Sequence, residues 1–392
     1  MEIPGVEQQH SRNRAPELQE AAIPALRPRL PGADRLLPYL RRIDATRVYS
    51  NWGPLAGEFG TRLSERFRLP SGAVAPASSG TSALVGAVLA HAGRATRHRP
   101  NAIIPALTFT ATGLAVEQCG YRVHLVDVDR ESWMLDPDQV AARADLERVG
   151  LVVPVAAFGK ALQQERWRAF SAATGIPVVI DAAASFEAVS TQPEQLLGPL
   201  PVALSFHATK SFATGEGGCV ACGDAGLARL SAQALNFGFW ERRGTTMPST
   251  NGKMSEYAAA VGLAELDGWA EKASEVGDAI AAYESAFAAA GLGDRLVVAP
   301  TVASSYVLFA ADTTGEAERV QDELLARRVG YRLWYGSGMR SHTYWKKASH
   351  DSDLRAAESL ATRLMGLPMA PDLSRTDVEA VAAAVAAGVA GA

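Results

Sequence analysis

The sequence predicts an α/β protein: a large domain with a mostly parallel sheet flanked by helices, followed by a smaller C-terminal α/β domain. From about residue 73 to residue 223, short apolar runs alternate with longer amphipathic stretches. Several of these stretches end in glycine after a last apolar turn, as helices commonly do. Strands that alternate with helices require crossover connections, which produce a parallel sheet covered by helices on both faces.

The elements of the large domain follow in a regular order. Residues 1–35 mix proline, arginine and polar residues without a sustained period, so we expect a poorly ordered N-terminal arm. A helical pattern then covers about residues 36–69 and breaks at Gly53–Pro54. The strand-like runs that follow are 102–106, 122–129, 151–158, 177–183, 202–208 and 218–224. The helical stretches between them are 81–93, 110–120, 136–150 and 163–175.

A long helical stretch over residues 252–290 is expected to bridge the two domains. The C-terminal part then shows a strand-like segment at 302–311, a helical one at 316–330 and a final helix at 374–392. We therefore expect a large domain over residues 36–270 and a small domain over residues 271–392.

The composition excludes several function classes. The 392 residues are 48% apolar and 20% charged, with a formal net charge of −4, which is typical of an ordinary soluble globular protein and argues against broad binding to nucleic acid or an anionic membrane. No apolar run approaches the roughly 20 residues that cross a bilayer, and the N-terminal segment lacks the basic-then-apolar order of a secretion signal. Three cysteines do not make a disulfide scaffold, so we expect a cytoplasmic protein.

A candidate phosphate site lies at Ser78–Leu84, between an extended segment and an apolar helix. Ligands bind at the carboxyl ends of parallel strands, so polar residues directly after each strand-like run are of interest. Small residues at a helix N-terminus leave backbone N–H groups free, and those donors suit a phosphate. For this segment alone, a simple helix cap by serine or threonine is the alternative.

Two charged residues follow later strand-like runs. Asp181 ends one run, where a carboxylate is costly to desolvate unless it meets a cation or several donors; a helix cap is the alternative. Lys210 follows another run and precedes a glycine-rich turn. A lysine in a site of low dielectric constant can lose its proton and attack a carbonyl, whereas the alternative is an exposed loop lysine.

Together the three features are typical of a pyridoxal phosphate site. That cofactor needs a phosphate cradle, a lysine that forms a Schiff base and an aspartate that pairs with the pyridinium nitrogen. A carboxylate about 4 Å from the ring nitrogen gains roughly 4 kcal/mol at an effective dielectric constant near 20, which keeps the ring protonated. The sequence therefore predicts pyridoxal 5′-phosphate as the cofactor.

No metal site is expected. Cys219 and Cys222 form a CxxC pair within a strand-like run, where residues three apart point to opposite faces, and Cys119 is the only other cysteine. The seven histidines show no ligand spacing. His207 precedes Lys210 by three residues, and either entry into the site or a structural hydrogen bond remains open for it.

Five motifs occur in a set order along the chain: SSGTSAL at 78–84, VVIDAAAS at 178–185, LSFHATKSFATGEGGCVACGD at 204–224, STNGKMSEYAAAVGLAELDGW at 249–269 and GLPMAPDLSRTDVEAV at 366–381. In their order and spacing, the chain from about Leu37 to its C-terminus resembles the DegT/StrS-type sugar aminotransferases, which are fold type I pyridoxal phosphate enzymes. The segment with the lysine and the GEGG turn is the most specific of the five.

The resemblance implies a role for each candidate residue. Lys210 would form the Schiff base and carry a proton between the donor's α-carbon and the cofactor. Asp181 would bind the ring nitrogen, and Phe109 would stack on the ring face. The residues that would hold the phosphate are Gly80, Thr81, Ser82 and Ser205. Asn251 of the partner subunit would complete this phosphate site, which implies a homodimer with shared active sites.

The chain departs from the family pattern where substrates are expected. Ala184 stands where the family often has a glutamine or histidine that touches the cofactor's hydroxyl group, and Lys253 stands where an arginine is common. The loops at 235–244 and 333–345 also differ from the family pattern. Lys210 separates the chain from relatives that carry histidine there and run dehydrations.

The resemblance implies an aminotransferase of a biosynthetic pathway in secondary metabolism. We expect it to move an amino group from an amino acid donor, glutamate or glutamine, to a keto group of a nucleotide-linked sugar. One alternative is an enzyme with the same cofactor that acts on a non-sugar metabolite by amination, lyase, cyclisation or condensation chemistry. A non-catalytic regulator that binds pyridoxal phosphate is the other.

Overall fold

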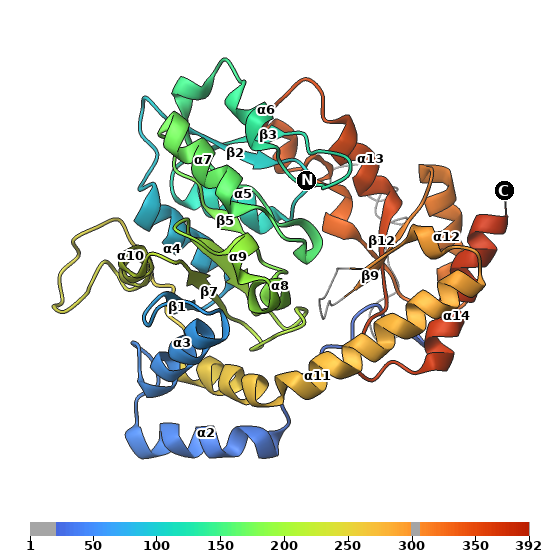
Figure 1. Ribbon diagram of the computed structural model, residues 1–392, viewed down its shortest axis with the longest axis horizontal. Coiled ribbons are helices and arrows are strands. Elements are labelled where there is room, and N and C mark those ends of the chain that lie inside the picture. The colour runs from blue at the N-terminus through green and yellow to red at the C-terminus, as the bar shows by residue number, and fades with distance from the viewer. Residues whose placement is uncertain (1–20, 299–305, 392) are drawn as a thin grey trace, which may run out of the picture.

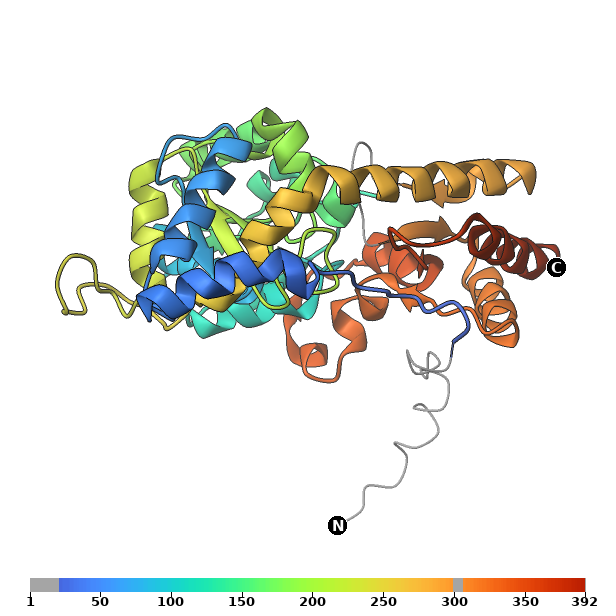
Figure 2. The same ribbon diagram turned by 90° about the horizontal axis from the view of Figure 1, so that it is seen from below.

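The computed structural model describes residues 21–298 and 306–391, and it divides them between two α/β domains that one long helix connects (Figures 1 and 2). The sheet of the large domain consists of two ladders with the strand orders β1-β7-β6-β5 and β11-β3-β2-β4. Parallel bridges from Val152 to Val178 and from Val155 to Asp181 join these ladders. The strands are β1 (Val74–Ala77), β2 (Asn101–Pro105), β3 (Arg122–Val126), β4 (Val149–Val152), β5 (Ile180–Asp181), β6 (Val202–Ser205), β7 (Gly218–Ala221) and β11 (Ser349–His350).

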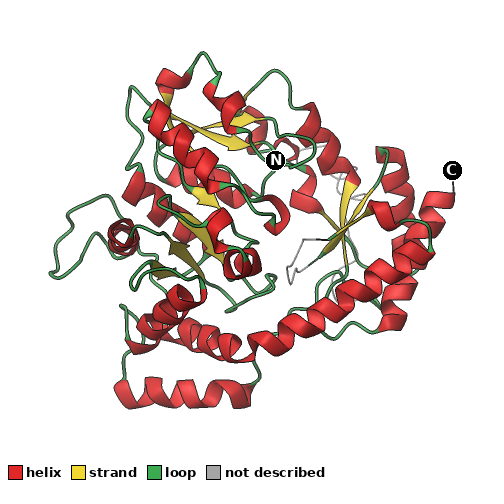
Figure 3. Ribbon diagram, in the orientation of Figure 1, coloured by secondary structure: helices red, strands yellow, loops and turns green. Residues whose placement is uncertain are grey.

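The sheet is mostly parallel, as predicted. Strand β3 pairs in parallel with both β11 and β2, β2 pairs in parallel with β4, and β5 pairs in parallel with β6. Only β7 runs against its neighbours β1 and β6. Helices flank the sheet (Figure 3), so its strands are shielded from water on both faces and are rich in apolar residues. This confirms the predicted fold class.

The helices of the large domain begin at recognisable caps. Pro54 stands at the first turn of α3 after Gly53, and the Ser79 side chain accepts a hydrogen bond from the backbone N–H of Ser82 at the start of α4. The helices are α2 (Ala33–Thr46), α3 (Pro54–Arg66), α4 (Gly80–His91), α5 (Thr110–Gln118), α6 (Pro137–Ala141), α7 (Gln164–Thr174), α8 (Phe186–Thr191), α9 (Pro193–Leu196) and α10 (Ala225–Leu235).

The helix predicted over 136–150 is shorter than expected. Helix α6 ends at Ala141, and a 3₁₀ turn follows at Leu146–Arg148. The chain cannot remain helical to residue 150, because Val149 already belongs to strand β4 beside β2.

The N-terminal segment differs in part from the poorly ordered arm expected over residues 1–35. Residues 1–20 lie outside the described residues. Residues 21–32 run along the small domain, where Ile23 forms a bridge with Val329 and Leu26 forms one with Met369, and α2 begins at Ala33. Ile23 and Ala25 are buried, so apolar contact holds this part of the segment in place.

The small domain is an antiparallel sheet covered by helices. Its strand order is β10-β12-β9-β8, and helices α12 and α14 pack on each other. Its elements are β8 (Leu296–Val297), β9 (Val307–Ala310), α12 (Thr314–Ala326), β10 (Arg332–Leu333), α13 (Arg355–Arg363), β12 (Leu364–Leu367) and α14 (Arg375–Ala390). Of the strand-like segment expected at 302–311, residues 302–305 lie outside the described part of the chain.

Helix α11 (Glu256–Ala289) connects the domains (Figure 1). The Ser255 side chain caps its N-terminus by accepting a hydrogen bond from the Ala258 N–H. Its N-terminal part packs against α2 and α3, and its C-terminal part reaches α14. The boundary predicted between residues 270 and 271 therefore falls inside a continuous helix. Of the helices in residues 21–298 and 306–391, none combines the length and the apolar character that crossing a membrane requires.

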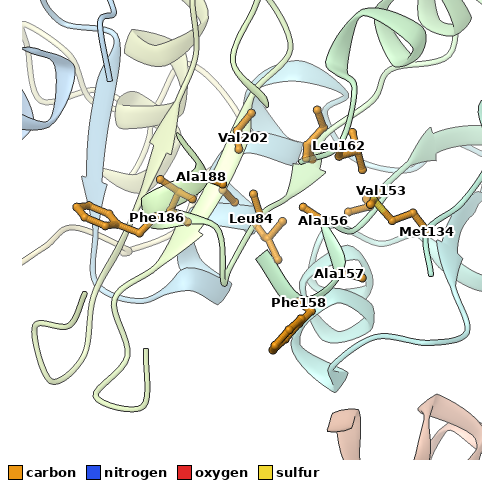
Figure 4. Packing of buried hydrophobic residues seen from close by; sticks show 14 of the residues in the cluster. Leu84, Met134, Val153, Ala156, Ala157, Phe158, Leu162, Phe186, Ala188 and Val202 are labelled. Atoms are coloured by element: carbon orange, nitrogen blue, oxygen red, sulfur yellow. The ribbon is translucent and has the colours of Figure 1, made fainter. Parts of the chain in front are cut away.

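An apolar core continues from the sheet to α11. Figure 4 shows Phe186 and Ala188 of α8 in this core, together with Leu84 of α4 and Val153 after β4. Phe212 stacks on Phe186 with ring centroids 4.0 Å apart and an interplanar angle of 14°, and Trp269 of α11 packs edge-on against both rings. This aromatic cluster fixes the loop after β6.

A segment between β10 and β12 of the small domain contacts the sheet of the large domain. Strand β11 pairs with β3, and the Asp127 carboxylate after β3 accepts hydrogen bonds from the N–H groups of Ala356 (2.9 Å) and Ala357 (2.8 Å). These contacts hold the first turn of α13, and the segment 333–351 before it, against the carboxyl ends of the large-domain strands.

Candidate active site

Asp181 lies at the carboxyl end of β5 and is 5% exposed. The Thr112 hydroxyl of α5 donates a hydrogen bond to Asp181 Oδ2 (2.8 Å), and the Ala183 N–H donates one to Oδ1 (3.1 Å). The two hydroxyl groups of Thr108 and Thr112 are 2.8 Å apart. Since Thr112 donates to the carboxylate, Thr108 donates to Thr112, and the chain of hydroxyl groups fixes the orientation of the carboxylate.

Burial raises the pKa of Asp181. The hydrogen bonds from Thr112 and the Ala183 N–H and the charge of Lys210 act in the opposite direction, because each favours the ionised form. A buried carboxylate of this kind is stabilised by a cation placed against it. A simple helix cap, the alternative for Asp181, does not account for its hydrogen bonds, because its shortest one comes from the side chain of Thr112 in α5.

Lys210 lies in the loop after β6, where its N–H donates a hydrogen bond to the His207 carbonyl (2.8 Å). Burial lowers the pKa of Lys210, and the negative charge of Asp181 opposes this effect. Within the described residues, the Lys210 Nζ makes no hydrogen bond or ion pair. The structure therefore brings an unpaired lysine near the buried aspartate, as predicted, and its lowered pKa favours the neutral, nucleophilic amine.

The predicted phosphate cradle lies at the N-terminus of α4 against the end of β6. The Ser82 hydroxyl lies 3.0 Å from the hydroxyl groups of both Ser78 and Ser79. A Cβ atom added at Gly80 would lie only 2.6 Å from the Cβ of Ser205, so the backbone here comes too close to β6 for any side chain. In the described part of the chain the N–H groups of Gly80 and Thr81 have no acceptor, and the helix dipole adds positive potential there. The helix cap and the cradle thus coexist: Ser79 caps α4 and the next two N–H groups remain available.

The remaining predicted residues lie around this centre. Phe109 directly precedes α5, three residues before Thr112, and is 60% exposed. Asn251 is exposed and accepts a hydrogen bond from the Lys253 ammonium (2.7 Å) in its own chain. The next residue, Gly252, accepts a hydrogen bond from the Ser78 N–H (2.8 Å), which ties this loop to the cradle. His207 is exposed and bonds Thr209 through Nδ1 (2.8 Å), which is the structural alternative left open for it.

Two residues near Asp181 were not predicted. Thr112 belongs to a helical stretch whose sequence gives no sign that one hydroxyl group faces a strand 69 positions away. Tyr335 comes from the loop at 333–345, which the sequence marks only as a departure from the family pattern, and its hydroxyl is close enough to Asp181 that the carboxylate charge contributes to raising its pKa, after burial.

The residues present fit pyridoxal phosphate. A buried carboxylate that needs a cation suits the ring nitrogen, a lysine with a lowered pKa suits the aldehyde, and free N–H groups beside a glycine without room for a side chain suit the phosphate.

Comparison with known proteins finds relatives that include aminotransferases. The sequence profile of the DegT/DnrJ/EryC1/StrS aminotransferase family matches residues 33–386. Protein Rv3402c of Mycobacterium tuberculosis is 30% identical over 373 residues, which cover 93% of this chain and 89% of that protein. The dTDP-4-amino-4,6-dideoxy-D-glucose transaminase of Shigella dysenteriae is 28% identical over 249 residues, or 63% of this chain and 65% of that protein. The solved structure of DesI with its TDP-sugar product is 29% identical, with a TM-score of 0.82 over 96% of this chain and 95% of that one.

Proposed function

Because this chain belongs to the DegT/DnrJ/EryC1/StrS aminotransferase family, whose enzymes depend on pyridoxal phosphate, we propose that it transfers an amino group to a keto group of a nucleotide-linked sugar. Aminotransferase chemistry and the cofactor follow from the family. The sugar acceptor is supported by the similarity to two proteins. The structure of DesI contains its TDP-sugar product, and the Shigella protein is a transaminase of dTDP-4-amino-4,6-dideoxy-D-glucose. The proposed amino donor is glutamate or glutamine.

The observation that carries the proposal is the placement of Lys210 and Asp181. Asp181 is the last residue of β5, and Lys210 lies in the loop after the neighbouring parallel strand β6. Each lies close enough to influence the pKa of the other. Parallel neighbours end at the same edge of a sheet, and the α4 cradle meets β6 at that edge. One small region thus offers an amine, a carboxylate and a phosphate site.

The residues of the chain divide the chemistry between them. Pyridoxal phosphate supplies, when bound, an aldehyde that condenses with an amine and a ring that accepts electrons from the substrate's α-carbon. Lys210 would provide the amine, because burial lowers its pKa and so favours the neutral form of Nζ, which is the form that can attack. Once a substrate amine had displaced it, the same Nζ would take a proton from the α-carbon of the amino donor and deliver that proton to the cofactor.

Asp181 and the cradle would hold what Lys210 acts on. The Asp181 carboxylate, oriented by Thr112, would stabilise positive charge on the ring nitrogen. Gly80, Thr81, Ser82 and Ser205 would hold the phosphate at the start of α4. Phe109 would cover one ring face, for which its exposed ring is available.

A homodimer is part of the proposal. Exposed aromatic rings gather beside the loop that carries Asn251: Tyr49 and Tyr257 stack with centroids 6.2 Å apart, and Phe237 and Trp240 are 43% and 48% exposed. A second copy of the chain would cover these rings and bring Asn251 of the partner subunit to the cradle. The enzyme would act in the cytoplasm.

The first experiment tests the chemistry at Lys210. Borohydride reduction of the purified protein, followed by peptide mapping, is expected to leave a pyridoxyl group on Lys210. A tag on another lysine, or on none, contradicts the proposed site. Amino donors are then screened by the keto acid that each releases, and keto acceptors are tested with and without a nucleotide group. Amination that does not depend on the nucleotide would favour a non-sugar substrate.

A second experiment tests the shared active site. A Lys210→Ala protein and an Asn251→Ala protein are mixed under conditions that exchange subunits. If each site takes Asn251 from the partner subunit, one site of each mixed dimer carries both changes and the other carries neither, so activity returns on mixing. If mixing restores nothing, Asn251 does not act across subunits.

A further inference from the structure

The turn at Trp334–Ser337 follows strand β10 of the small domain and carries two side chains with hydrogen-bond donors, the Trp334 indole and the Tyr335 phenol. It lies against the large domain. Two contacts fix the segment that follows: the Met339 N–H donates to the Ala106 carbonyl after β2 (3.1 Å), and the Trp345 indole donates to the Thr110 hydroxyl of α5 (2.8 Å). Since α5 also carries Thr112, the segment lies against the helix that orients Asp181.

The same turn reaches Asp181 from a second side. Ala156, in the segment after β4, donates its N–H to the Asp181 carbonyl (2.8 Å), and two residues later the ring of Phe158 meets that of Trp334 edge-on with centroids 5.2 Å apart. Phe158 and Tyr335 both have left-handed backbone, with φ of 56° and 54°. Such conformations are unfavourable for residues other than glycine and cluster where function requires a fixed geometry.

Neither the Trp334 indole nor the Tyr335 phenol donates a hydrogen bond to an acceptor within the described residues. The Trp334 indole N–H is buried, in a residue only 8% exposed, and it lies beside the Tyr335 phenol oxygen without making a hydrogen bond of good geometry in the described part of the chain. Burial of a donor without an acceptor is unfavourable, because the group loses its hydrogen bonds to water and gains none in return. Burial, and after it the Asp181 charge, raise the pKa of the Tyr335 phenol, against the nearby Phe158 N–H and Trp334 indole, which lower it. The phenol therefore keeps its proton and can act as a donor.

The strand order places these donors opposite the phosphate cradle. The cradle meets the end of β6 on one side of β5, whereas Phe158 and the Trp334 turn lie at the segment after β4 on the other side. If the ring nitrogen of pyridoxal phosphate were to pair with Asp181 and its phosphate were held at α4, the residues near the segment after β4 would be the ones available to its ring hydroxyl group. Ala184 offers no polar side chain for that oxygen.

We propose that Tyr335 and Trp334 bind the ring hydroxyl oxygen of pyridoxal phosphate, so that a turn from outside the large-domain core completes the cofactor site. This inference rests on the cofactor placement under the proposed function. It adds two cofactor-binding residues to the site and gives the altered loop at 333–345 a role in cofactor binding.

The test compares Tyr335→Phe with wild type and with Tyr331→Phe. Tyr331 lies just before β10 and bonds Gln321, so its variant removes a phenol oxygen from the small domain without touching Asp181. Two readouts are used for each holoenzyme: the pyridoxal phosphate retained on dialysis, and the pH midpoint of the visible absorption of the bound cofactor. Thermal unfolding checks that each variant is folded.

In Tyr335→Phe we expect about tenfold weaker retention, because a hydrogen bond to a charged acceptor is lost. The spectral midpoint is expected to rise by about one pH unit, because the phenol no longer competes with the linkage proton for the same oxygen. Trp334→Phe should shift both readouts in the same direction, and Tyr331→Phe should shift neither.

Two results would overturn the inference: wild-type retention and midpoint in Tyr335→Phe, or equal shifts in Tyr335→Phe and Tyr331→Phe. Borohydride mapping of the wild type separates this failure from that of the proposed function. A tag on Lys210 with an unchanged Tyr335→Phe protein refutes only the role of Tyr335. Absence of the tag refutes the cofactor site and the inference with it.

Discussion

Replacing Gly80 by alanine tests whether the α4 cradle is built by close approach of two backbones. The added Cβ would lie 2.6 Å from Ser205 Cβ, 2.9 Å from its Oγ and 3.1 Å from its Cα, whereas ordinary contact begins at 3.4 Å. The Oγ atom could rotate away, but Cα and Cβ, the second of which makes the shortest contact, are held by the backbone of β6. Either the first turn of α4 or the end of β6 must shift by several tenths of an ångström.

Such overpacking costs about 1–3 kcal/mol, and it falls where the free N–H groups of α4 begin. We expect Gly80→Ala to lower the free energy of unfolding by that amount in urea titrations of the cofactor-free protein. Retention of pyridoxal phosphate should fall about tenfold for each 1.4 kcal/mol that the displaced cradle loses toward the phosphate.

Gly277→Ala in α11 provides the matched control. A Cβ at Gly277 meets nothing within 4 Å, and alanine is favoured over glycine inside a helix by about 1 kcal/mol, so this variant should be at least as stable as wild type. If Gly80→Ala unfolds and retains cofactor as wild type does, the cradle tolerates a side chain and the geometric reasoning is refuted.

Three further changes test the electrostatics of the protein. Burial raises the folded-state pKa of Asp181 above its unfolded value, so the contribution of Asp181 to stability is complete below about pH 4 and is lost as the pH rises through the folded-state pKa. Asp181→Asn should remove this loss, which urea unfolding of the cofactor-free protein across pH would show. The same variant should retain less cofactor on dialysis of the holoenzyme. Glu265→Ala leaves the buried Lys272 ammonium, 2.5 Å from the Glu265 carboxylate in wild type, without its charge partner and should lower the free energy of unfolding by about 3–5 kcal/mol in urea titrations. Asp127→Ala removes the acceptor for two N–H groups at the start of α13 and should cost about 0.5–2 kcal/mol, with faster hydrogen exchange of Ala356 and Ala357.

Each of these three expectations has a result that contradicts it. A pH dependence of unfolding in Asp181→Asn equal to that of wild type would show that this carboxylate does not titrate as argued. For the buried pair, the double variant Glu265→Leu with Lys272→Met is the control, and it should regain most of the lost stability. Unchanged exchange at α13 after Asp127→Ala would show that the cap is not maintained in solution.

The sequence was sufficient for most of the large sheet, although it gave no sign of β11, and for the positions of Asp181 and Lys210 relative to that sheet. Strand β5 delivers Asp181 and the loop after β6 delivers Lys210, because apolar runs and the residues that end them are local signals. Thr112 was missed for a physical reason: its hydroxyl bonds Asp181 only because α5 packs beside β5, and helical periodicity reports which face is buried but not which distant atom it meets.

The loop at 333–345 and the N-terminal segment show the same limit. Tyr335 reaches Asp181 through a turn with left-handed backbone, which no pattern of hydrophobicity encodes. Residues 21–32 look featureless in sequence because they form no helix or sheet of their own, and they acquire their place from single bridges to Val329 and Met369.

The continuous α11 has a consequence for how the two domains can move. Its 34 residues have a contour of about 50 Å, and Figures 1 and 2 show that the helix bends between its N-terminal part and the longer part that reaches the small domain. Because one helix runs through both domains, any change in the orientation of the small domain is coupled to a change in this bend.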